Sequence, residues 1–341
     1  MPRRRLRDVA PRPASRVLWA AALLGAAALA GCGGIQSALD PAGPDAQRIA
    51  ELTAWMSGGA AVVWLLVVGL AVYVLRVAPG EHPRRTALLI IGGGAVFPTV
   101  VLAGLLAYGL AMIPPLLAPA PPGGPTITVS GEQWWWRVHY QPAGGGAPVE
   151  LANELRLPVG RRVDVFLESP DVIHAFWVPS ITGKIDMVPG RRNRIALEPS
   201  RTGLFRGACA EYCGASHALM NFYVVVEEEE DFERWLAHQA RPAAPPQGAL
   251  AARGARLFLA HGCGACHTVR GTPADGGVGP DLTHVGSRVS LAAGVLPNER
   301  ADLLRWIERT GDIKPEVHMP TFSMLPRQDL QALAAYLEGL R

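Results

Sequence analysis

Residues 209–220 read Cys209-Ala210-Glu211-Tyr212-Cys213-Gly214-Ala215-Ser216-His217-Ala218-Leu219-Met220, and this stretch decides how the rest of the chain is interpreted. Its cysteines, histidine and methionine recur at spacings of four, four and three, which would also align them on one face of a helix. Two observations favour a loop between strands instead. Glycines stand at positions 207 and 214, and residues 222–226 are rich in β-branched and aromatic side chains.

The donor atoms of this stretch are typical of a copper site. Thiolate, imidazole and thioether groups together select copper, and His/Cys/Met ligation is the pattern of cupredoxin electron-transfer sites. Two cysteines can also bridge two coppers if each metal has its own histidine, but the stretch supplies only His217. His174 is the candidate for the second histidine, although alone it would be interpreted as a core residue. A structural zinc site and a disulfide between Cys209 and Cys213 are the alternatives.

Around this stretch, strand-like runs alternate with turn residues. Residues 126–129, 163–166 and 222–226 carry β-branched and aromatic side chains, and Gly, Pro and Asn bound these runs. Residues 126–239 are therefore predicted to form a β-sandwich or barrel.

A second motif lies in residues 249–341. Cys263-Gly264-Ala265-Cys266-His267 has the C-x-x-C-H spacing of covalent haem attachment, in which two thioethers hold the porphyrin and the histidine reaches the iron. A disulfide between the two cysteines is the alternative. Helical patterns at residues 249–260, 299–309 and 328–340 predict an all-α domain, and the Ala/Pro-rich residues 240–248 are predicted to link it to the β domain.

This C-terminal region resembles the class I cytochromes c. The resemblance rests on the C-x-x-C-H motif, on Gly279-Pro280-Asp281-Leu282, and on Met319-Pro320 before the last helix. It implies one haem c bound covalently through Cys263 and Cys266, with His267 and Met319 as the axial ligands of its iron. Met324 is the alternative sixth ligand, and either methionine could instead pack against the ring.

Two stretches without charged residues, 55–75 and 86–113, predict transmembrane helices within an N-terminal segment 32–113. About 20 residues suffice to cross the hydrocarbon core, so buried helices of a soluble domain are a poor alternative. The connecting loop carries three arginines and one glutamate, which predicts a cytoplasmic loop with the later domains on the outer side of the membrane. Pro98 is expected to kink the second helix, and the proline-rich residues 114–125 are predicted to be a linker.

Residues 1–31 are interpreted as an export signal, because an arginine-rich start precedes an apolar run. Leu29-Ala30-Gly31-Cys32 resembles a bacterial lipobox, which implies lipidation of Cys32; a plain signal peptide with a chance cysteine is the alternative.

The composition and net charge of the chain exclude some classes of protein. Hydrophobic residues make up 49% of the chain and charged residues 18%, which indicates that part of the chain lies in lipid and excludes disorder. The net charge of +3 depends on residues 1–16, which hold six arginines and one aspartate; 26 basic and 28 acidic residues remain without them. The charge therefore predicts no nucleic-acid partner.

Considered together, these segments resemble subunit II of the haem-copper cytochrome c oxidases, in the branch with a fused C-terminal cytochrome c. The resemblance extends from Asp40-Pro41-Ala42-Gly43 through the haem domain. It implies a multi-domain membrane protein with a two-helix transmembrane hairpin, a cupredoxin-like β-sandwich and an all-α class I cytochrome c domain. One departure is that residues 86–113 contain no acidic side chain, so no proton-uptake residue is assigned.

The resemblance also implies roles for individual residues. Cys209 and Cys213 would bridge two copper ions in a dinuclear A centre; the other ligands would be His174 and His217, one on each copper, the Met220 thioether on one copper, and the Glu211 backbone carbonyl on the other. The Glu211 side chain would point towards a magnesium site shared with subunit I. Gln133-Trp134-Trp135-Trp136 matches the aromatic segment of the family, where electrons enter at Trp134, while Trp135 and Trp136 are expected to pack in a strand.

The implied function is electron transfer in a terminal oxidase of the bacterial cytoplasmic membrane. The chain would pass electrons from its own haem to copper and on to subunit I, where oxygen is reduced to water. The implied partners are subunit I, other oxidase subunits, membrane lipid and an external electron donor. The alternative is a free-standing, membrane-anchored carrier of copper and haem that serves another reductase. A quinol oxidase subunit is disfavoured because such subunits generally lack these copper ligands.

Overall fold

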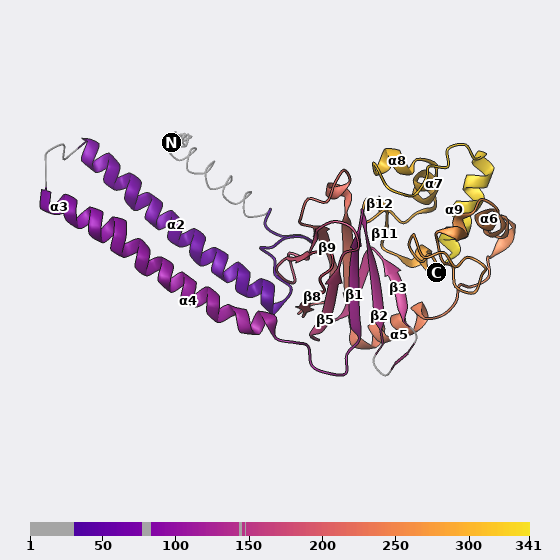
Figure 1. Cartoon of the computed structure of the whole chain (residues 1–341), viewed down its shortest axis with the longest axis horizontal. Helices are drawn as coiled ribbons and strands as arrows, with labels where there is room; N and C mark the ends of the chain where they lie inside the picture. The colour runs from indigo at the N-terminus through magenta and orange to yellow at the C-terminus, as the bar shows by residue number, and fades with distance from the viewer. Residues whose placement is uncertain (1–30, 77–82, 143–144, 147) are drawn as a thin grey trace, which may run out of the picture.

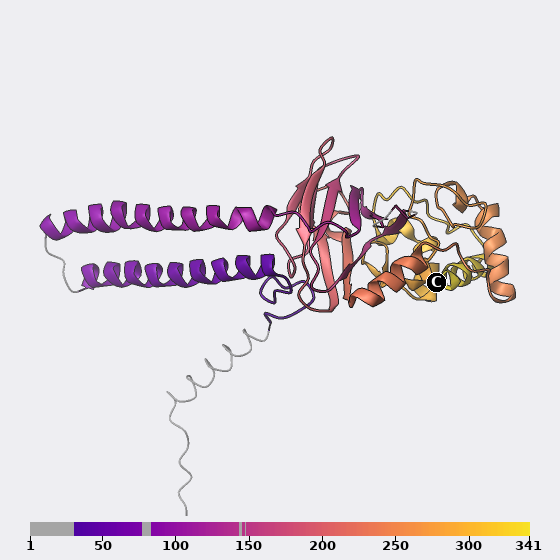
Figure 2. The ribbon, with the colours of Figure 1, turned by 90° about the horizontal axis from the view of Figure 1, so that it is seen from below.

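The computed structural model describes residues 31–76, 83–142, 145–146 and 148–341; the predicted export signal lies outside them except for residue 31. Figures 1 and 2 show three parts along the long axis of the molecule: two long helices, a β-sandwich and a helical domain. Both long helices project from one side of the sandwich, and the helical domain lies on the opposite side. The predicted three-part architecture is confirmed.

The two long helices are apolar over most of their length. The first, α2, covers Pro44–Arg76, and the second passes through α3 (Pro83–Leu88), the π-helical segment η1 (Leu89–Val96) and α4 (Phe97–Leu117). Both are long and apolar enough to cross a membrane, and no residue in their most apolar windows is buried. The described part of the chain leaves the apolar side chains of both helices exposed.

The first helix begins earlier than predicted, and the second is irregular where a kink was predicted. α2 starts at Pro44 rather than at residue 55, because proline is favoured in a first helical turn and the Asp45 carboxylate accepts a hydrogen bond from Arg48. Pro98 lies in the first turn of α4, directly after η1. The irregularity near Pro98 is therefore a change from π-helical to α-helical hydrogen bonding.

The prediction of a linker from residue 114 is wrong for residues 114–117, because α4 continues to Leu117. Side chains of the sandwich explain the extension. The Arg162 guanidinium donates to the carbonyl oxygens of Pro115, Leu116 and Ala118, and Arg194 donates to that of Leu117. The last carbonyl groups of a helix lack the usual backbone partner four residues later, and these arginines supply donors to them.

Two five-stranded sheets form the sandwich. The first has the strand order β3-β2-β1-β5-β8 and the second β4-β10-β9-β6-β7. The strands of the first sheet are β1 (Thr126–Glu132), β2 (Trp135–Gln141), β3 (Val149–Ala152), β5 (Val163–Glu168) and β8 (Asn193–Leu197). Those of the second are β4 (Glu154–Pro158), β6 (His174–Trp177), β7 (Ile185–Met187), β9 (Gly203–Cys209) and β10 (Asn221–Glu227). Buried and less buried side chains alternate along β2 and β5, so the inner faces of the two sheets enclose one core.

The sandwich presents the cysteine-rich stretch at the ends of two adjacent strands. β9 ends at Cys209 and β10 begins at Asn221, and the residues between them form a loop that contains the 3-10 turn η2 (His217–Leu219). We call residues 209–220 the cysteine loop. β9 pairs with β6, which begins at His174. Gly207 allows this region to pack tightly, because a Cβ there would lie 2.1 Å from the Phe222 ring. The predicted loop is therefore confirmed, and the helical stripe is excluded.

The C-terminal domain is helical, as predicted. It contains α6 (Gly248–Ala260), α7 (Arg300–Glu308), α8 (Thr310–Ile313) and α9 (Arg327–Gly339), the short strands β11 (Ser290–Leu291) and β12 (Leu296–Pro297), and the 3-10 turns η3 (Cys263–Ala265) and η4 (Val285–Ser287). α6 and α9 cross at close range, because a Cβ on Gly254 would lie 2.0 Å from the Ala332 carbonyl oxygen. Phe258 and Tyr336 pack edge to face beside this crossing, with ring centroids 5.7 Å apart.

The segment between the two outer domains is fixed to both of them. Helix α5 (Glu229–Gln239) packs on the sandwich, where the Trp235 ring lies 5.5 Å from that of Tyr140. Arg270 of the helical domain donates to the Gln239 carbonyl oxygen at 2.6 Å and accepts from the Ala243 N–H at 2.9 Å. Because α6 begins at Gly248, the predicted linker 240–248 is one residue too long. The linker is held by hydrogen bonds to the helical domain and is not a free, flexible segment.

Candidate metal centre

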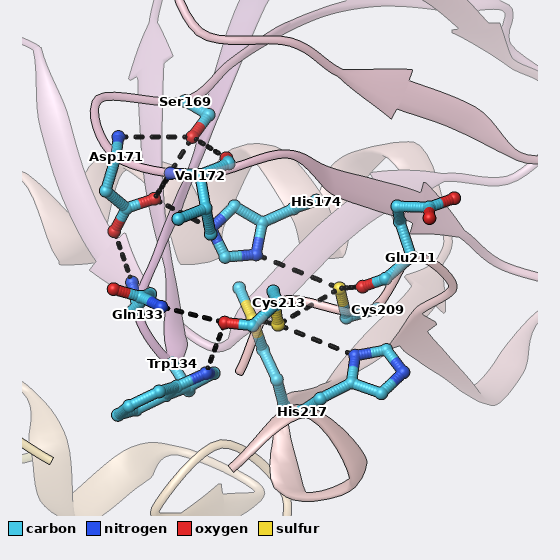
Figure 3. Close-up of polar contacts among 11 residues, drawn as sticks. Gln133, Trp134, Ser169, Asp171, Val172, His174, Cys209, Glu211, Cys213 and His217 are labelled. Atoms are coloured by element: carbon cyan, nitrogen blue, oxygen red, sulfur yellow. Dashed lines mark hydrogen bonds and ion pairs between the residues drawn. The ribbon is translucent and has the colours of Figure 1, made fainter. Parts of the chain in front are cut away.

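The cysteine loop brings two thiols and two imidazoles together (Figure 3). The sulfur atoms of Cys209 and Cys213 are 3.7 Å apart and not bonded to each other. His174 Nδ1 lies 3.8 Å from the Cys209 sulfur, and His217 Nδ1 lies 3.5 Å from the Cys213 sulfur. Donor atoms of His174, Cys209 and Cys213 all lie within 4.8 Å of one another. Each sulfur therefore has its own imidazole, and the sulfurs lie between the two rings.

Two weaker donor atoms are divided between the sulfurs in the same way. The Glu211 carbonyl oxygen is 3.2 Å from the Cys209 sulfur, and the Met220 sulfur is 3.8 Å from the Cys213 sulfur. The Glu211 carboxylate points away from the sulfurs in Figure 3 and lies 3.8 Å from Lys184 Nζ. The arrangement thus has two halves, each with one imidazole and one weak donor, that share a pair of thiols.

The two thiols are buried and form a hydrogen bond with each other. This hydrogen bond lowers the pKa of Cys209, which favours its thiolate form, and raises the pKa of Cys213. Thiolate is the form that binds metal. The burial, charge and softness of this donor set fit copper.

Asp171 fixes the orientation of His174. Its Oδ1 lies 2.9 Å from His174 Nε2, which must carry the proton of that contact and leaves Nδ1 directed at the sulfur. Burial raises the pKa of Asp171, but hydrogen bonds from the Gln133 and Val172 N–H groups and from His174 outweigh it, and the net pKa is lowered. Gly131 provides room behind the ring, since a Cβ there would lie 3.0 Å from it.

The three tryptophans have different environments, and Trp134 is not in a strand. It occupies the turn between β1 and β2, is 4% exposed, and donates from Nε1 to the Cys213 carbonyl oxygen at 2.9 Å (Figure 3). Gly214 has φ +114° and a Cβ there would lie 2.9 Å from the Trp134 ring, so both its conformation and its size require glycine. Trp136 is buried in the core as expected, whereas Trp135 is only partly buried and lies under the Arg137 guanidinium.

The C-x-x-C-H segment forms a tight turn beside the core of the helical domain. The His267 N–H donates to the Cys263 carbonyl oxygen at 3.0 Å, and His267 Nδ1 donates to the Pro280 carbonyl oxygen at 2.8 Å. Burial lowers the pKa of His267, which favours a neutral imidazole whose Nε2 is an acceptor. Gly279 lies against this ring, because a Cβ there would be 2.6 Å from it.

The two candidate methionines differ in exposure. Met319 packs against the apolar core of the helical domain, whereas Met324 is 74% exposed. Cys263 is half-buried and Cys266 is exposed, and neither forms a disulfide. This donor set fits a covalently attached haem with histidine and methionine on its iron.

Sequence reasoning missed two polar residues beside these sites. Asp171 stands three positions before His174, but nothing local shows that its carboxylate returns to the ring. Lys314 is one of only two lysines in the chain, and its scarcity was the only available signal.

The fold and these clusters define a class of protein: a membrane-anchored chain with a cupredoxin-like domain and a cytochrome c domain. Residues 143–228 match the family described as cytochrome C oxidase subunit II, periplasmic domain, and residues 251–341 match the family cytochrome c. The chain is similar to the cytochrome c oxidase subunit 2 of Alkalihalophilus pseudofirmus, with 33% identity over 331 residues that cover 92% of this chain and 94% of that protein.

The cytochrome c oxidase subunit 2 of Bacillus subtilis is 31% identical over 227 residues, which cover 63% of this chain and 62% of that protein. Among solved structures, the periplasmic domain of subunit II of cytochrome oxidase from Bradyrhizobium japonicum is 32% identical and covers 35% of this chain and 96% of that one, with a TM-score of 0.33. The chain belongs to the cytochrome c oxidase subunit 2 family. It is a subunit of an oxidoreductase complex, with copper implied for its β domain and haem for its cytochrome c domain.

Proposed function

We propose that this chain receives electrons at its cytochrome c domain and passes them through the cysteine loop to oxidase subunit I, which reduces oxygen to water. One observation carries the proposal: two thiols lie between two imidazoles, with a weak donor on each side, in a domain fused to a C-x-x-C-H domain. Two coppers held by this set would supply a centre that accepts and donates one electron. The haem would supply the preceding one-electron couple.

The division of donor atoms supports specific ligand roles. Cys209 and Cys213 would be shared by two copper ions; His174 and the Glu211 carbonyl oxygen would hold one copper, and His217 and Met220 would hold the other. Asp171 keeps His174 in the tautomer that leaves Nδ1 free to bind.

The contacts of the cytochrome domain support thioether bonds to the haem from Cys263 and Cys266, and iron ligation by His267 and Met319. The bond from His267 Nδ1 to Pro280 leaves Nε2 for iron. The packing of the partly buried Met319 against the helical core and the exposure of Met324 favour Met319 as sixth ligand.

Trp134 is proposed to lie on the route from haem to copper. Its indole donates to the Cys213 carbonyl oxygen, and its own carbonyl accepts a hydrogen bond from Lys314 of the cytochrome domain. Trp134 is therefore in contact with both sides of the transfer.

The chain is membrane-anchored. We propose that α2 and the α3–α4 helix span the bacterial cytoplasmic membrane with the two redox domains on the outer side, next to subunit I and other oxidase subunits. An external donor would reduce the haem, and the Glu211 carboxylate, 44% exposed, is available for a magnesium ion shared with subunit I.

The alternative, a free-standing carrier for another reductase, differs from the proposed oxidase subunit in the proteins that copurify with the chain. We expect the chain purified from native membranes in mild detergent to elute with a larger, haem-containing subunit that consumes oxygen. Elution as a single chain with copper and haem but without oxygen consumption would favour the free-standing carrier.

Cys32 is proposed to be the lipidated N-terminus of the mature chain. A single acyl chain binds membranes only marginally, and two long helices already anchor the protein. We expect mass spectrometry of the native protein to show cleavage before Cys32 and lipid on its sulfur, and Cys32→Ser protein to remain in the membrane fraction. An unmodified or uncleaved Cys32 in the native host would exclude lipidation.

A further inference from the structure

The cytochrome domain packs directly on the cysteine loop. Figures 1 and 2 both show the helical domain against the sandwich. The Ser216 hydroxyl, which is fully buried, donates to the Pro315 carbonyl oxygen at 2.6 Å. The Asn221 N–H, directly after this loop at the start of β10, donates to the Ala293 carbonyl oxygen at 3.1 Å. Two loops of the cytochrome domain therefore contact the segment that carries the copper-ligand candidates.

Lys314 is buried in this interface. It follows α8, is 2% exposed, and donates from Nζ to the Trp134 carbonyl oxygen and, at 3.3 Å, to the Ala292 carbonyl oxygen. Within the residues that the structure describes, no carboxylate forms an ion pair with it. Burial lowers the pKa of Lys314 to about 7.

A buried amino group, whether amine or ammonium, that has no carboxylate partner is unfavourable unless its hydrogen bonds are made. The two carbonyl oxygens come from different domains, so undocking removes the acceptor on Trp134. An apolar side chain could pack in many relative positions of the two domains, whereas the hydrogen bonds of Lys314 are made in only one such position. The contact thus favours a single docked arrangement.

Two hydrogen bonds connect Lys314, in the cytochrome domain, to the cysteine loop through Trp134. Trp134 accepts from Lys314 at its carbonyl and donates to Cys213 from its indole. Lys314 stands five residues before Met319, in the segment that follows α8. Movement of Lys314 would therefore move the methionine side of the cytochrome domain relative to the cysteine loop.

We propose that Lys314 is a positioning residue that locks the cytochrome domain on the cysteine loop in the arrangement used for haem-to-copper transfer. The effect on haem-to-copper transfer rests on the proposed function. The docking of the cytochrome domain can be measured without any electron transfer. Two further contacts between the domains, from Arg137 to the Gly277 carbonyl oxygen and from the Val289 N–H to the Glu154 carboxylate, support the same arrangement. Neither contact involves Lys314 or Trp134.

The test compares Lys314→Met with the wild type in the full-length chain. Methionine keeps the length of the side chain but has no donor for the two carbonyl oxygens. Arg309→Met is the matched control, because it removes one positive charge from an exposed side chain five residues earlier. Lys314→Gln, which keeps an N–H donor without the charge, is expected to restore part of the contact.

The first readout is amide hydrogen exchange in the full-length chain with its haem and copper bound. In Lys314→Met we expect exchange in residues 210–221 and 289–296 to accelerate about tenfold, which corresponds to about 1.4 kcal/mol of interface stability. Exchange in α6 and α9 should not change, and Arg309→Met should match the wild type. Unchanged exchange at the interface overturns the proposal. So does acceleration throughout α6 and α9, since Lys314 would then stabilise the domain rather than its position.

The second readout is haem-to-copper transfer in the loaded chain. Transfer in Lys314→Met should be slower and should depend on solvent viscosity, because domain docking then limits it, while both metal spectra stay unchanged. Lys314→Gln should lie between the two. A rate equal to that of the wild type and independent of viscosity overturns the positioning role. If the wild-type chain transfers no electrons while the exchange difference persists, the proposed function fails and the docking role of Lys314 stands.

Discussion

Cys213→Ser is expected to abolish the dinuclear copper signal. The Cys213 sulfur lies 3.7 Å from the Cys209 sulfur, 3.5 Å from His217 Nδ1 and 3.8 Å from the Met220 sulfur, so it joins both halves of the donor set. A hydroxyl is a poor ligand for soft copper and cannot replace a bridging thiolate. Copper content should fall from two ions per chain to one or none, and the EPR hyperfine pattern of two equivalent nuclei should disappear.

Tyr212→Phe is the control for this change, because Tyr212 is 76% exposed in the same loop and its ring contacts His217 without a hydrogen bond. It should keep two coppers and the wild-type EPR spectrum. Retention of a two-copper signal in Cys213→Ser would contradict the ligand assignment. Zinc in the wild-type protein would contradict the choice of metal.

Met319→Leu is expected to lower the reduction potential of the haem and to remove the spectral band that a thioether ligand gives to ferric haem. Leucine has nearly the volume of methionine, so packing against the helical core should be kept. Histidine and methionine ligation raises the potential of haem. The decrease should be on the order of 0.1 V or more, since axial ligands move haem potentials over about 0.8 V in total.

Met324→Leu provides the comparison. Its side chain is largely exposed, and we expect the potential and the ferric spectrum to equal those of the wild type. Potentiometric titration of the full-length chain measures both variants. The opposite pattern, with loss of the band in Met324→Leu alone, would assign the sixth ligand to Met324.

Much of the fold could be predicted because its signals are local. Residues 163–166 and 222–226 lie within strands β5 and β10, and residues 249–260 lie within helix α6, because side-chain type and turn residues determine these elements over short distances. The cysteine loop and the C-x-x-C-H turn are likewise contiguous in sequence, so their candidate ligand residues are recognisable there, whereas the role of each residue came from the family resemblance.

The remaining features depend on contacts between distant residues. α4 continues past Pro114 because Arg162 and Arg194 supply donors to its last turn, and no local pattern contains that information. Trp134 lies in a turn rather than a strand, and its environment is completed by Lys314, 180 positions later. Such contacts follow from how the separate domains dock, which spacing cannot show.

Flash-initiated reduction of the haem in the full-length, metal-loaded chain, with haem oxidation and copper reduction followed together, shows whether electrons move within the chain. We expect the haem to be reoxidised as copper is reduced, at a rate independent of protein concentration, because donor and acceptor are docked in one chain. Trp134→Ala should slow this step while leaving both metal spectra intact. A rate proportional to protein concentration, or a haem that stays reduced beside oxidised copper, would contradict transfer within the chain.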